Sequence, residues 1–299
     1  MEGSTKVKLV VLVGPPGSGK STYSWTLRDY ARVSQDDHGK EGHWELFNNF
    51  LNQGLNIVVD RMNFSKEQRA RYLDAAKAKG YETEIRIFAM GYDDCLMRMA
   101  PRLDGRQKHA TIQNEENARN ALHVFFTRFE RPQDEEADDV LWGTQSIGGI
   151  PCIVVDLDGT LCNIEHRLHH VRTEGKKDWV TFFKECVKDE MHLWCMELIR
   201  AMADREHEIV FASGRAADQC GAETKKWLDD RLRPLGIPYT LFMRHGRDFR
   251  RDDVVKEIIL DFEILPKFDP LFVVDDRKQV VDMWRSRGLT CLQCAPGDF

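Results

Sequence analysis

The residues that point most clearly to chemistry form a glycine-rich segment near the start of the chain. Gly14-Pro-Pro-Gly-Ser-Gly-Lys20-Ser21-Thr22 follows the apolar run 7–13 and precedes a segment with helical character. A G-x-x-x-x-G-K-[ST] motif between a strand and a helix is typical of a phosphate-binding loop. Its backbone N–H groups face an anion, its lysine reaches the outer phosphates, and its Ser hydroxyl suits Mg²⁺. We therefore expect ATP and Mg²⁺ as cofactors, with the nucleotide bound by Gly14, Gly17, Ser18, Gly19, Lys20, Ser21 and Thr22, and with Ser21 on the metal.

A second group of reactive side chains follows three further apolar runs. The run 152–155 leads into Asp156-Leu-Asp158-Gly159-Thr160, 209–212 into Ser213-Gly214-Arg215, and 271–274 into Asp275-Asp276. Because the carboxyl ends of parallel strands meet at one edge of a sheet, these groups are predicted to converge there with Lys256. Carboxylates beside a lysine suit Mg²⁺ and a phosphate. The predicted metal ligands are Asp156, Asp158, Asp275 and Asp276.

The elements that position these groups alternate between strand and helix patterns. Strands are predicted over 7–13, 55–59 and 84–89, and helices over 21–29, 42–53, 65–80, from 93, and 113–130. Ser65 and Gln68 form a capping box at the start of one helix. Such alternation predicts an α/β fold with two doubly wound parallel-sheet domains. The acidic segment 131–139 and the glycines after it predict a connection, so we expect domains over 1–140 and 150–299.

Composition limits the classes of partner and compartment. The 299 residues carry a formal net charge of −6, so a nucleic-acid partner requires a local basic patch, for which 244–251 is the candidate. No apolar run reaches the ~20 residues of a membrane span, and no signal-peptide core precedes the first strand. The eight cysteines lack framework spacing, which favours reduced thiols and a cytoplasmic protein. The tryptophans are typical of core or helix-face positions and single out no base-stacking residue.

The four motifs of the second half, which occur in the same order, resemble those of the haloacid-dehalogenase phosphatases. The resemblance implies that Asp156 is the nucleophile that forms an aspartyl-phosphate. It implies that Asp158 is first general acid and then general base, with Arg215 counted among the catalytic residues. Ser213 would hold a phosphoryl oxygen, and Lys256 would neutralise the nucleophile and the phosphate.

In the first half, a kinase needs a base near the acceptor hydroxyl and cations over the transferring phosphoryl group. Asp36, after the short segment 32–34, is the candidate base, and Asp60 closes the second strand. Arg98, Arg102 and Arg106 recur every four residues, so on a helix they share one face and can close over ATP as a lid. A solvent-exposed basic face is the alternative for any one of them.

Taken in order, the motifs resemble the polynucleotide 5′-kinase/3′-phosphatases of the T-even bacteriophage type over nearly the whole chain. The segments 251–257 and 275–285 and the ending Gly297-Asp298-Phe299 carry the resemblance. It implies transfer of the ATP γ-phosphate to 5′-hydroxyl ends of RNA or DNA, and removal of a 3′-phosphate or 2′,3′-cyclic phosphate. It also implies cooperation with a ligase, a host-cytoplasmic location and a homotetramer. Asp36 then matches the base, Asp60 an acceptor-site acid and Arg102 the lid arginine, with Arg106 as the alternative.

One position departs from that pattern, and two other functions stay open. The phage-type pattern has an arginine three residues after the base, where this chain has Gly39; Lys40 and Arg61 are candidates to replace it. A small-molecule kinase joined to a small-molecule phosphatase would use the same motifs. An ATP-gated nucleic-acid adaptor would not need the intact reactive residues. The histidines after Asp158 are either substrate contacts or surface residues: His166, His169 and His170.

Overall fold

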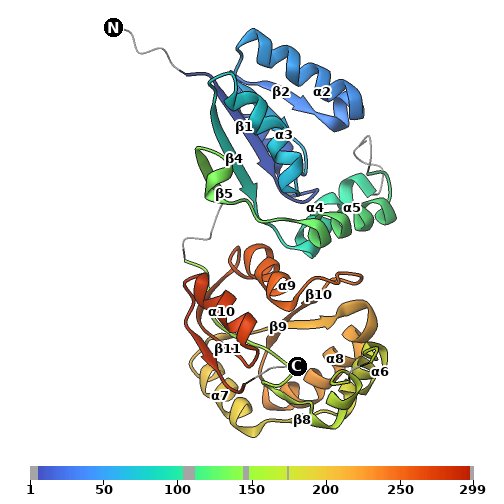
Figure 1. The fold of residues 1–299 in the computed structure, drawn as a ribbon. Coiled ribbons are helices and arrows are strands. Elements are labelled where there is room, and N and C mark those ends of the chain that lie inside the picture. The colour runs from blue at the N-terminus through green and yellow to red at the C-terminus, as the bar shows by residue number, and fades with distance from the viewer. Residues whose placement is uncertain (1–5, 104–111, 144–147, 174, 297–299) are drawn as a thin grey trace. The chain divides into compact units, whose positions relative to one another are not determined.

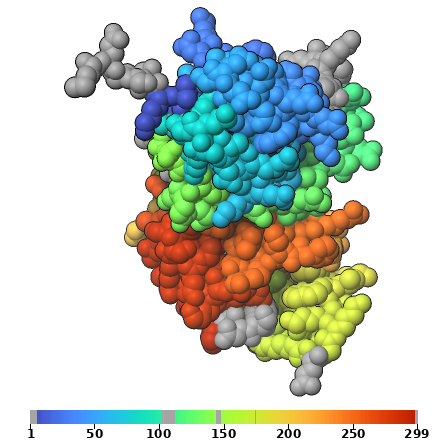
Figure 2. Space-filling model, turned by 45° about the horizontal axis from the view of Figure 1, so that its top comes forward, coloured from blue at the N-terminus to red at the C-terminus, as the bar shows by residue number. Residues whose placement is uncertain are grey.

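The computed structural model describes residues 6–103, 112–143, 148–173 and 175–296. The chain separates into two compact units, 1–145 and 146–299 (Figure 1). Figure 2 colours the surface atoms of the first unit blue to green and those of the second yellow to red. Each unit contains a parallel sheet with helices, which confirms the predicted α/β class. Among the described residues, no helix combines the length and apolar character needed to cross a bilayer.

The first unit is built on a five-stranded sheet with the order β2-β3-β1-β4-β5. All neighbouring strands are parallel. The strands are β1 (Lys8–Val13), β2 (Ala31–Ser34), β3 (Ile57–Asp60), β4 (Glu82–Phe88) and β5 (Asp139–Gly143). The central strand β1 is apolar and buried from Leu9 to Val13, as expected for a strand covered on both faces. The carboxyl ends of β1, β2 and β3 therefore lie side by side.

Helices of the first unit follow the predicted order with two differences in length. They are α1 (Lys20–Ser24), α2 (Gln35–Gln53), α3 (Lys66–Lys77), α4 (Tyr92–Leu103) and α5 (Glu115–Arg128). The expected helix over 21–29 ends at Ser24, where the Ser24 and Thr26 hydroxyls bind nearby carbonyl oxygens and compete with helical hydrogen bonds. Helix α2 begins earlier than predicted and is broken at Gly39, whose φ and ψ are 73° and 178°. One half of the predicted capping box is confirmed, since the Ser65 side chain accepts a hydrogen bond from the Gln68 backbone N–H. The other half is absent, because the Gln68 side-chain oxygen accepts no hydrogen bond.

The acidic segment 131–139 is not a linker, contrary to expectation. It contains the short 3-10 helix η1 (Asp134–Glu136) and leads directly into β5, which adds to the sheet of the first unit. Glu136 binds the buried Arg69 guanidinium through two hydrogen bonds of 2.7 and 2.9 Å. Asp138 accepts the Thr83 backbone N–H at 2.8 Å. The acidic residues thus serve as partners within the fold, and the boundary between the units lies after Gly143, at 145/146.

The second unit contains a five-stranded parallel sheet with the order β10-β9-β6-β11-β12. Its strands are β6 (Ile150–Val155), β9 (Glu208–Ala216), β10 (Tyr239–Arg244), β11 (Phe268–Asp275) and β12 (Cys291–Gln293), with a small antiparallel pair, β7 (Cys162–Asn163) and β8 (Glu190–Met191). Side chains alternate across β6: Ile153 and Val155 pack into one core and Cys152 and Val154 into another. All eight cysteines carry free thiols.

The remaining elements of the second unit are mostly helical. They are η2 (Glu165–His170), α6 (Trp179–Lys184), η3 (Glu185–Lys188), α7 (Leu193–Ala203), α8 (Ala217–Leu232), η4 (Arg233–Leu235), α9 (Asp252–Ile259), η5 (Leu260–Ile264) and α10 (Lys278–Ser286). Trp284 of α10 is fully buried and packs into the same core as Val154, Val210 and Val273. This packing holds α10 against the strands whose carboxyl ends carry Asp156 and Asp275.

Candidate active sites

The glycine-rich loop joins β1 to α1 in the first unit. Gly17 and Gly19 have φ of 84° and 99°, a region that favours glycine, and a Cβ on Gly17 would lie 2.7 Å from the Cys95 carbonyl oxygen. The Lys20 ammonium, largely buried, donates to the Pro15 carbonyl oxygen at 2.7 Å. Beside the loop is a cavity of about 520 Å³, whose wall includes Gly17, Gly19, Lys20, Ser21 and Thr22. Gly14 and Ser18 are buried within the loop and are not part of that wall.

Two predicted acids also line this cavity. Asp36 begins α2 after β2, Asp60 ends β3, and both line the cavity. Asp60 is buried and its Oδ2 accepts hydrogen bonds from Arg32 Nη2 at 2.6 Å and from Arg32 Nε at 3.1 Å. Arg32 also contacts Asp37. Burial raises the pKa of Asp37, but the Arg32 guanidinium outweighs burial and lowers that pKa overall.

The predicted lid arginines fall partly outside the described residues. Arg98 of α4 lines the cavity, and its Nη1 lies 3.7 Å from the position that a Cβ on Gly19 would take. Arg102 lies in the last turn of α4, where the structure describes the backbone but not this side chain. Arg106 lies outside the described residues. The choice of lid arginine therefore stays a prediction, with Arg98 as the residue that lies near the loop.

In the second unit, a buried lysine lies beside a cluster of three carboxylates. Lys256 of α9 donates to Asp156 Oδ1 at 2.7 Å and to Asp275 Oδ2 at 2.8 Å. One oxygen each from Asp156, Asp275 and Asp276 lies within 4.8 Å of the others. The cluster holds more negative than positive charge, and oxygen donors in this arrangement fit Mg²⁺. These residues come from β6, α9 and the end of β11, as the strand-end pattern predicts.

The pKa shifts in this cluster follow from burial and from the like charges. Burial raises the pKa of Asp156 well above its usual value; Lys256 opposes that shift and Asp275 adds to it. Burial and then the Asp275 charge raise the pKa of Asp276 to about 7. Burial alone would lower the pKa of Lys256, but Asp156 and Asp275 outweigh it and raise that pKa. Lys256 is therefore a charged ammonium at neutral pH, and the carboxylates favour a second cation.

The Asp158 carboxylate is not part of this cluster. Its Oδ1 accepts hydrogen bonds from Arg167 Nη2 at 2.6 Å and from Arg215 Nε at 2.9 Å. Asp189 binds the same two arginines, with three N–H···O distances of 2.7 Å. Burial raises the pKa of Asp158, but the two guanidiniums outweigh burial and hold that pKa well below its usual range. In this arrangement Asp158 is an ionised, weakly basic carboxylate, and it can take up and donate a proton only after its arginine contacts loosen.

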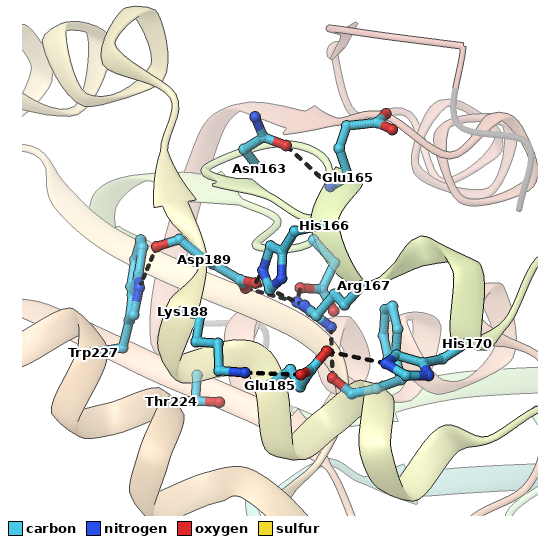
Figure 3. A network of polar contacts seen from close by, with 12 residues as sticks. Asn163, Glu165, His166, Arg167, His170, Glu185, Lys188, Asp189, Thr224 and Trp227 are labelled. Carbon is cyan, nitrogen blue, oxygen red and sulfur yellow. Dashed lines mark hydrogen bonds and ion pairs between the residues drawn. The ribbon is translucent and has the colours of Figure 1, made fainter.

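Figure 3 shows the surroundings of Asp189. His166 Nε2 contacts Asp189 Oδ1 at 2.9 Å, and the Trp227 indole N–H donates to the Asp189 carbonyl oxygen at 2.9 Å (Figure 3). His170 Nε2 contacts Glu185 Oε2 at 3.0 Å, and the His169 and His170 rings lie 3.9 Å apart. Of the three histidines that the sequence offered as substrate contacts or surface residues, His166 and His170 contact carboxylates of the protein, and His169 is exposed. None of them lines the cavity that contains Asp156.

That cavity has a volume of about 400 Å³ and combines three kinds of side chain. Asp156, Asp158 and Asp276 form its acidic part. Aromatic side chains form a second part: Trp179, Phe182, Phe183 and Phe249. Arginines from the predicted basic segment and from the end of β11 form the third: Arg244, Arg247, Arg250 and Arg277. Ser213 is buried below the wall, and its Oγ accepts the Arg215 backbone N–H at 3.3 Å.

Comparison with known proteins agrees with this arrangement. Residues 150–299, half of the chain, match the phosphatase domain of polynucleotide kinase PNKP. The chain belongs to the polynucleotide kinase/phosphatase family. A protein of Autographa californica nuclear polyhedrosis virus, whose name joins polynucleotide kinase and RNA ligase, is 25% identical over 310 residues, which cover 93% of this chain and 41% of that protein. The chain thus spans about two fifths of the length of this relative.

Two further similarities differ in how much of the chain they cover. An Arabidopsis thaliana protein named transcription factor bHLH140 is 32% identical over 107 residues, or 31% of this chain and 11% of that protein. A chain in a structure of the Pnkp1/Rnl/Hen1 RNA repair complex is 22% identical, with both chains covered completely and a TM-score of 0.43.

Several residues of this family member were missed by sequence reasoning. Arg32, Arg167 and Asp189 hold the predicted acids, and Asp252 lies 3.8 Å from the Lys256 ammonium and 3.2 Å from Arg244. A Cβ on Gly214 would lie 2.0 Å from Asp252 Oδ1, so the glycine after Ser213 makes room for this carboxylate. No local motif marks these residues. Only Arg32 could have been found from the sequence, because it lies within the short segment that leads to Asp36.

Proposed function

We propose that this protein heals broken nucleic-acid ends. The first unit, which carries the phosphate-binding loop and is called the P-loop unit below, transfers the γ-phosphate of ATP to a 5′-hydroxyl end of RNA or DNA. The second unit, called the phosphatase unit below, removes a 3′-phosphate or a 2′,3′-cyclic phosphate. The observation that carries the proposal is that each unit has its own cavity with reactive groups. Lys20, Ser21, Asp36 and Asp60 line one, and Asp156, beside Lys256 and Asp276, lines the other.

In the P-loop unit, the loop N–H groups and Lys20 would bind the ATP phosphates, with Ser21 holding Mg²⁺. Bound Mg²⁺ would offset the negative charge of the phosphates. Asp36 would accept the proton of the 5′-hydroxyl while the oxygen of that hydroxyl bonds to the γ-phosphorus. The bond between the γ-phosphorus and the oxygen of the leaving ADP breaks at the same time. Asp60 would position the acceptor, and an arginine of the α4 region would cover the transferring group. Lys20, Asp36 and Arg98 all line the same cavity, and this supports these roles.

In the phosphatase unit, an Asp156 oxygen would bond to the phosphorus of the 3′-phosphate as the bond from phosphorus to the 3′-oxygen breaks. Asp158, once protonated, would give its proton to that leaving oxygen. It would then take a proton from water as the water oxygen attacks the phosphorus, which releases phosphate and restores Asp156. Lys256 would stabilise the charge on Asp156, and Asp156, Asp275 and Asp276 would hold Mg²⁺, which lowers the repulsion between carboxylate and phosphate.

The wall of the phosphatase cavity favours a nucleotide end over a small phosphorylated metabolite. Trp179 and Phe249 are 41% and 88% exposed, although they line a cavity that contains the reacting carboxylate. Exposed aromatic rings stack on bases, at about 1–3 kcal/mol per base, and arginines bind the backbone phosphates. A metabolite phosphatase needs neither group.

The wider assignments are part of this proposal. The order of the two units and the segments 251–257 and 275–285 support a relation to the T-even phage type, from which Gly39 departs. The name of the viral relative, which joins polynucleotide kinase to RNA ligase, supports a ligase as the functional partner. We propose that the ends prepared by this protein pass to such an enzyme. A homotetramer, implied by the phage resemblance, is checked by sedimentation of the full chain.

The decisive experiment separates the two activities. Wild-type protein is incubated with γ-labelled ATP and a 5′-hydroxyl oligonucleotide, and separately with a 3′-phosphorylated one. Lys20→Ala is expected to abolish label transfer and keep phosphate release, and Asp156→Asn to do the reverse. Lys79→Ala, at an exposed position just after α3, and Asp230→Asn, at an exposed position of α8, are the matched controls. If wild-type protein transfers no label to any RNA or DNA end, the metabolite kinase is favoured instead.

A further inference from the structure

We infer that Cys186 and Cys220 form a site of reversible oxidation, at which hydrogen peroxide joins the two thiols in a disulfide and slows the phosphatase unit. No cysteine takes part in the chemistry proposed above, and all eight thiols are free. The thiol pair stands without the proposed function, whereas its effect on phosphate release rests on that function. Two thiols in contact can form a disulfide, which a single buried thiol cannot.

The two thiols come from elements that pack against each other. Cys186 lies in η3 and Cys220 in α8, and these two elements are in contact. Both side chains are fully buried, and a hydrogen bond joins the two thiols. Only a further approach of the two sulfur atoms therefore separates the pair from a disulfide, whose S–S bond is about 2.05 Å long.

Their surroundings give the two thiols different reactivities. The hydrogen bond from Cys220 lowers the pKa of Cys186 to about 7; burial opposes this shift, and the charge of Arg215 adds to it. The same hydrogen bond, together with burial, raises the pKa of Cys220. Burial also raises the pKa of the other thiols of this unit: Cys152, Cys162, Cys195, Cys291 and Cys294. Cys186 is therefore the thiol that ionises near neutral pH and attacks an oxidant, and Cys220 is its resolving partner.

The oxidation takes place in two steps. The Cys186 thiolate sulfur bonds to one oxygen of hydrogen peroxide as the O–O bond breaks, which gives a sulfenic acid and a hydroxide ion that takes up a proton to become water. The Cys220 sulfur then bonds to the Cys186 sulfur as the S–O bond breaks, and the leaving oxygen departs as water with the Cys220 proton. The two thiols lose two electrons, which the peroxide gains. An added dithiol cleaves the disulfide again by thiol–disulfide exchange.

A small oxidant can reach the pair from the phosphatase cavity. Ala216 and Gln219 line that cavity, and Cys220 follows Gln219 directly. The Cys220 sulfur lies 3.6 Å from the Ala216 carbonyl oxygen, which places it directly behind the cavity wall. Cys220 also interrupts α8, since its φ and ψ of −146° and 19° are not helical. A break in a helix lowers the cost of local opening, and such an opening exposes the thiols to the cavity.

Each thiol lies beside a residue that positions Asp158. The Cys186 carbonyl oxygen accepts the Asp189 backbone N–H at 3.2 Å. One turn along α8 from the second thiol, the Thr224 hydroxyl accepts a hydrogen bond from Arg215 Nη1, also at 3.2 Å. A bond between the two sulfur atoms draws η3 and α8 together and shifts these two attachments. Because Asp189 and Arg215 hold Asp158 in its network, oxidation should displace the proposed acid and base.

Mass spectrometry of the full chain tests whether the bond forms. Reduced wild-type protein is treated with hydrogen peroxide, the remaining thiols are alkylated, and the protein is digested with trypsin. Tryptic cleavage places Cys186 in the peptide 185–188 and Cys220 in the peptide 216–225. We expect a linked species with the mass of both peptides less two hydrogen atoms, and its disappearance after treatment with dithiothreitol. Absence of this species, under conditions that oxidise methionines of the same protein, would overturn the inference.

Activity assays on the same samples test the effect of the bond. Oxidised wild-type protein should release phosphate from a 3′-phosphorylated oligonucleotide at least about 10-fold more slowly, because a displacement of about 1 Å can cost about 100-fold in rate. Dithiothreitol should restore the rate. Cys220→Ala removes one of the two sulfur atoms and should keep its rate in peroxide. Cys291→Ala, which removes a buried thiol outside the pair, is the matched control and should be inhibited as the wild type is.

Label transfer from ATP to a 5′-hydroxyl end should be unchanged in these samples, because both thiols belong to the other unit. A linked form that keeps its phosphatase rate, equal inhibition of Cys220→Ala and wild type, or a parallel loss of kinase activity would also overturn the inference. If reduced wild-type protein releases no phosphate from any 3′-phosphorylated end, the proposed function fails, and the linked peptides still decide whether the thiols form the site. If it releases phosphate and no linked peptide forms, only this inference fails.

Discussion

Replacement of Asp189 by asparagine tests how the phosphatase unit keeps four charges in its interior. Arg167, Arg215 and Asp189 have no exposed side-chain area, and the Asp158 side chain is 17% exposed. Two guanidiniums and two carboxylates balance each other. Asp189→Asn preserves the shape of the side chain and leaves two guanidiniums facing the single Asp158 carboxylate.

The structure gives the size of the expected effect. Asp189 oxygens accept three N–H groups from Arg167 and Arg215, each at 2.7 Å. At about 1.5–3 kcal/mol for a hydrogen bond to a charged group, three such bonds set an upper limit of about 4.5–9 kcal/mol. The amide oxygen keeps part of these bonds. Removal of one partner from a buried ion pair costs about 3–5 kcal/mol, and we expect a loss of stability in that range.

Urea unfolding followed by tryptophan fluorescence measures this loss. Trp227 donates to the Asp189 carbonyl oxygen, so its emission reports on the unit that the substitution weakens. Arg167→Met should also destabilise, but the double variant restores the balance of charge and should be more stable than the sum of the two effects by about 1–3 kcal/mol. Asp230→Asn, on the exposed face of α8, is the control and should change stability by less than about 0.5 kcal/mol. A cost below about 1 kcal/mol for Asp189→Asn, or strict additivity in the double variant, would refute the reasoning.

Three further predictions test other parts of the molecule. A Cβ on Gly159, whose φ is 87°, would lie 2.3 Å from Asp276 Oδ2. Gly159→Ala should therefore weaken Mg²⁺ affinity about 10- to 100-fold and reduce phosphatase activity but not kinase activity. Full phosphatase activity in this variant would contradict the prediction. Exhaustive chelation should abolish both activities, and added Mg²⁺ should restore both; activity that survives chelation would exclude the proposed metal. Burial lowers the pKa of His43 from 6.5, so its contribution to stability is present above pH 6.5 and is lost as the pH falls through and below that value. His43→Gln should therefore reduce the fall in the urea midpoint of the P-loop unit between pH 7.5 and 5.5, and an unchanged fall would show that other groups cause it.

Much of the fold was predictable because its signals are local. Apolar runs that end in Asp60, Asp156 and Asp275 form buried strands that end at those residues. The side-chain cap at Ser65 was predictable for the same reason, since its partner is three residues away. Strand ends of parallel sheets share an edge, and this rule was sufficient to bring Asp156 and Asp275 together. Lys256 lies on helix α9, and its role there came from the resemblance to the phosphatases.

The supporting residues were not predictable because their partners are far away in the chain. Arg69 and Glu136 are 67 residues apart, and Asp189 is 26 residues from Arg215. The acidic segment that suggested a linker shows the difficulty. Its composition is that of a solvent-exposed connection. In the fold, however, Glu136 neutralises a buried arginine, and Asp138 accepts a backbone N–H of β4. Composition records how many charges a segment carries and not which of them the fold will bury.

The two cavities differ in the partners of their cationic side chains, and this difference fits the direction of the two proposed reactions. In the phosphatase unit, Lys256, Arg167 and Arg215 are all paired with carboxylates of the protein, and the three clustered aspartates leave an excess of negative charge. The proposed Mg²⁺ would offset that excess as the anionic phosphate approaches Asp156. In the P-loop unit, Arg61 lines the cavity and donates to the neutral Tyr72 hydroxyl. That cavity is therefore suited to hold phosphates, and the phosphatase cavity to cleave one and release it.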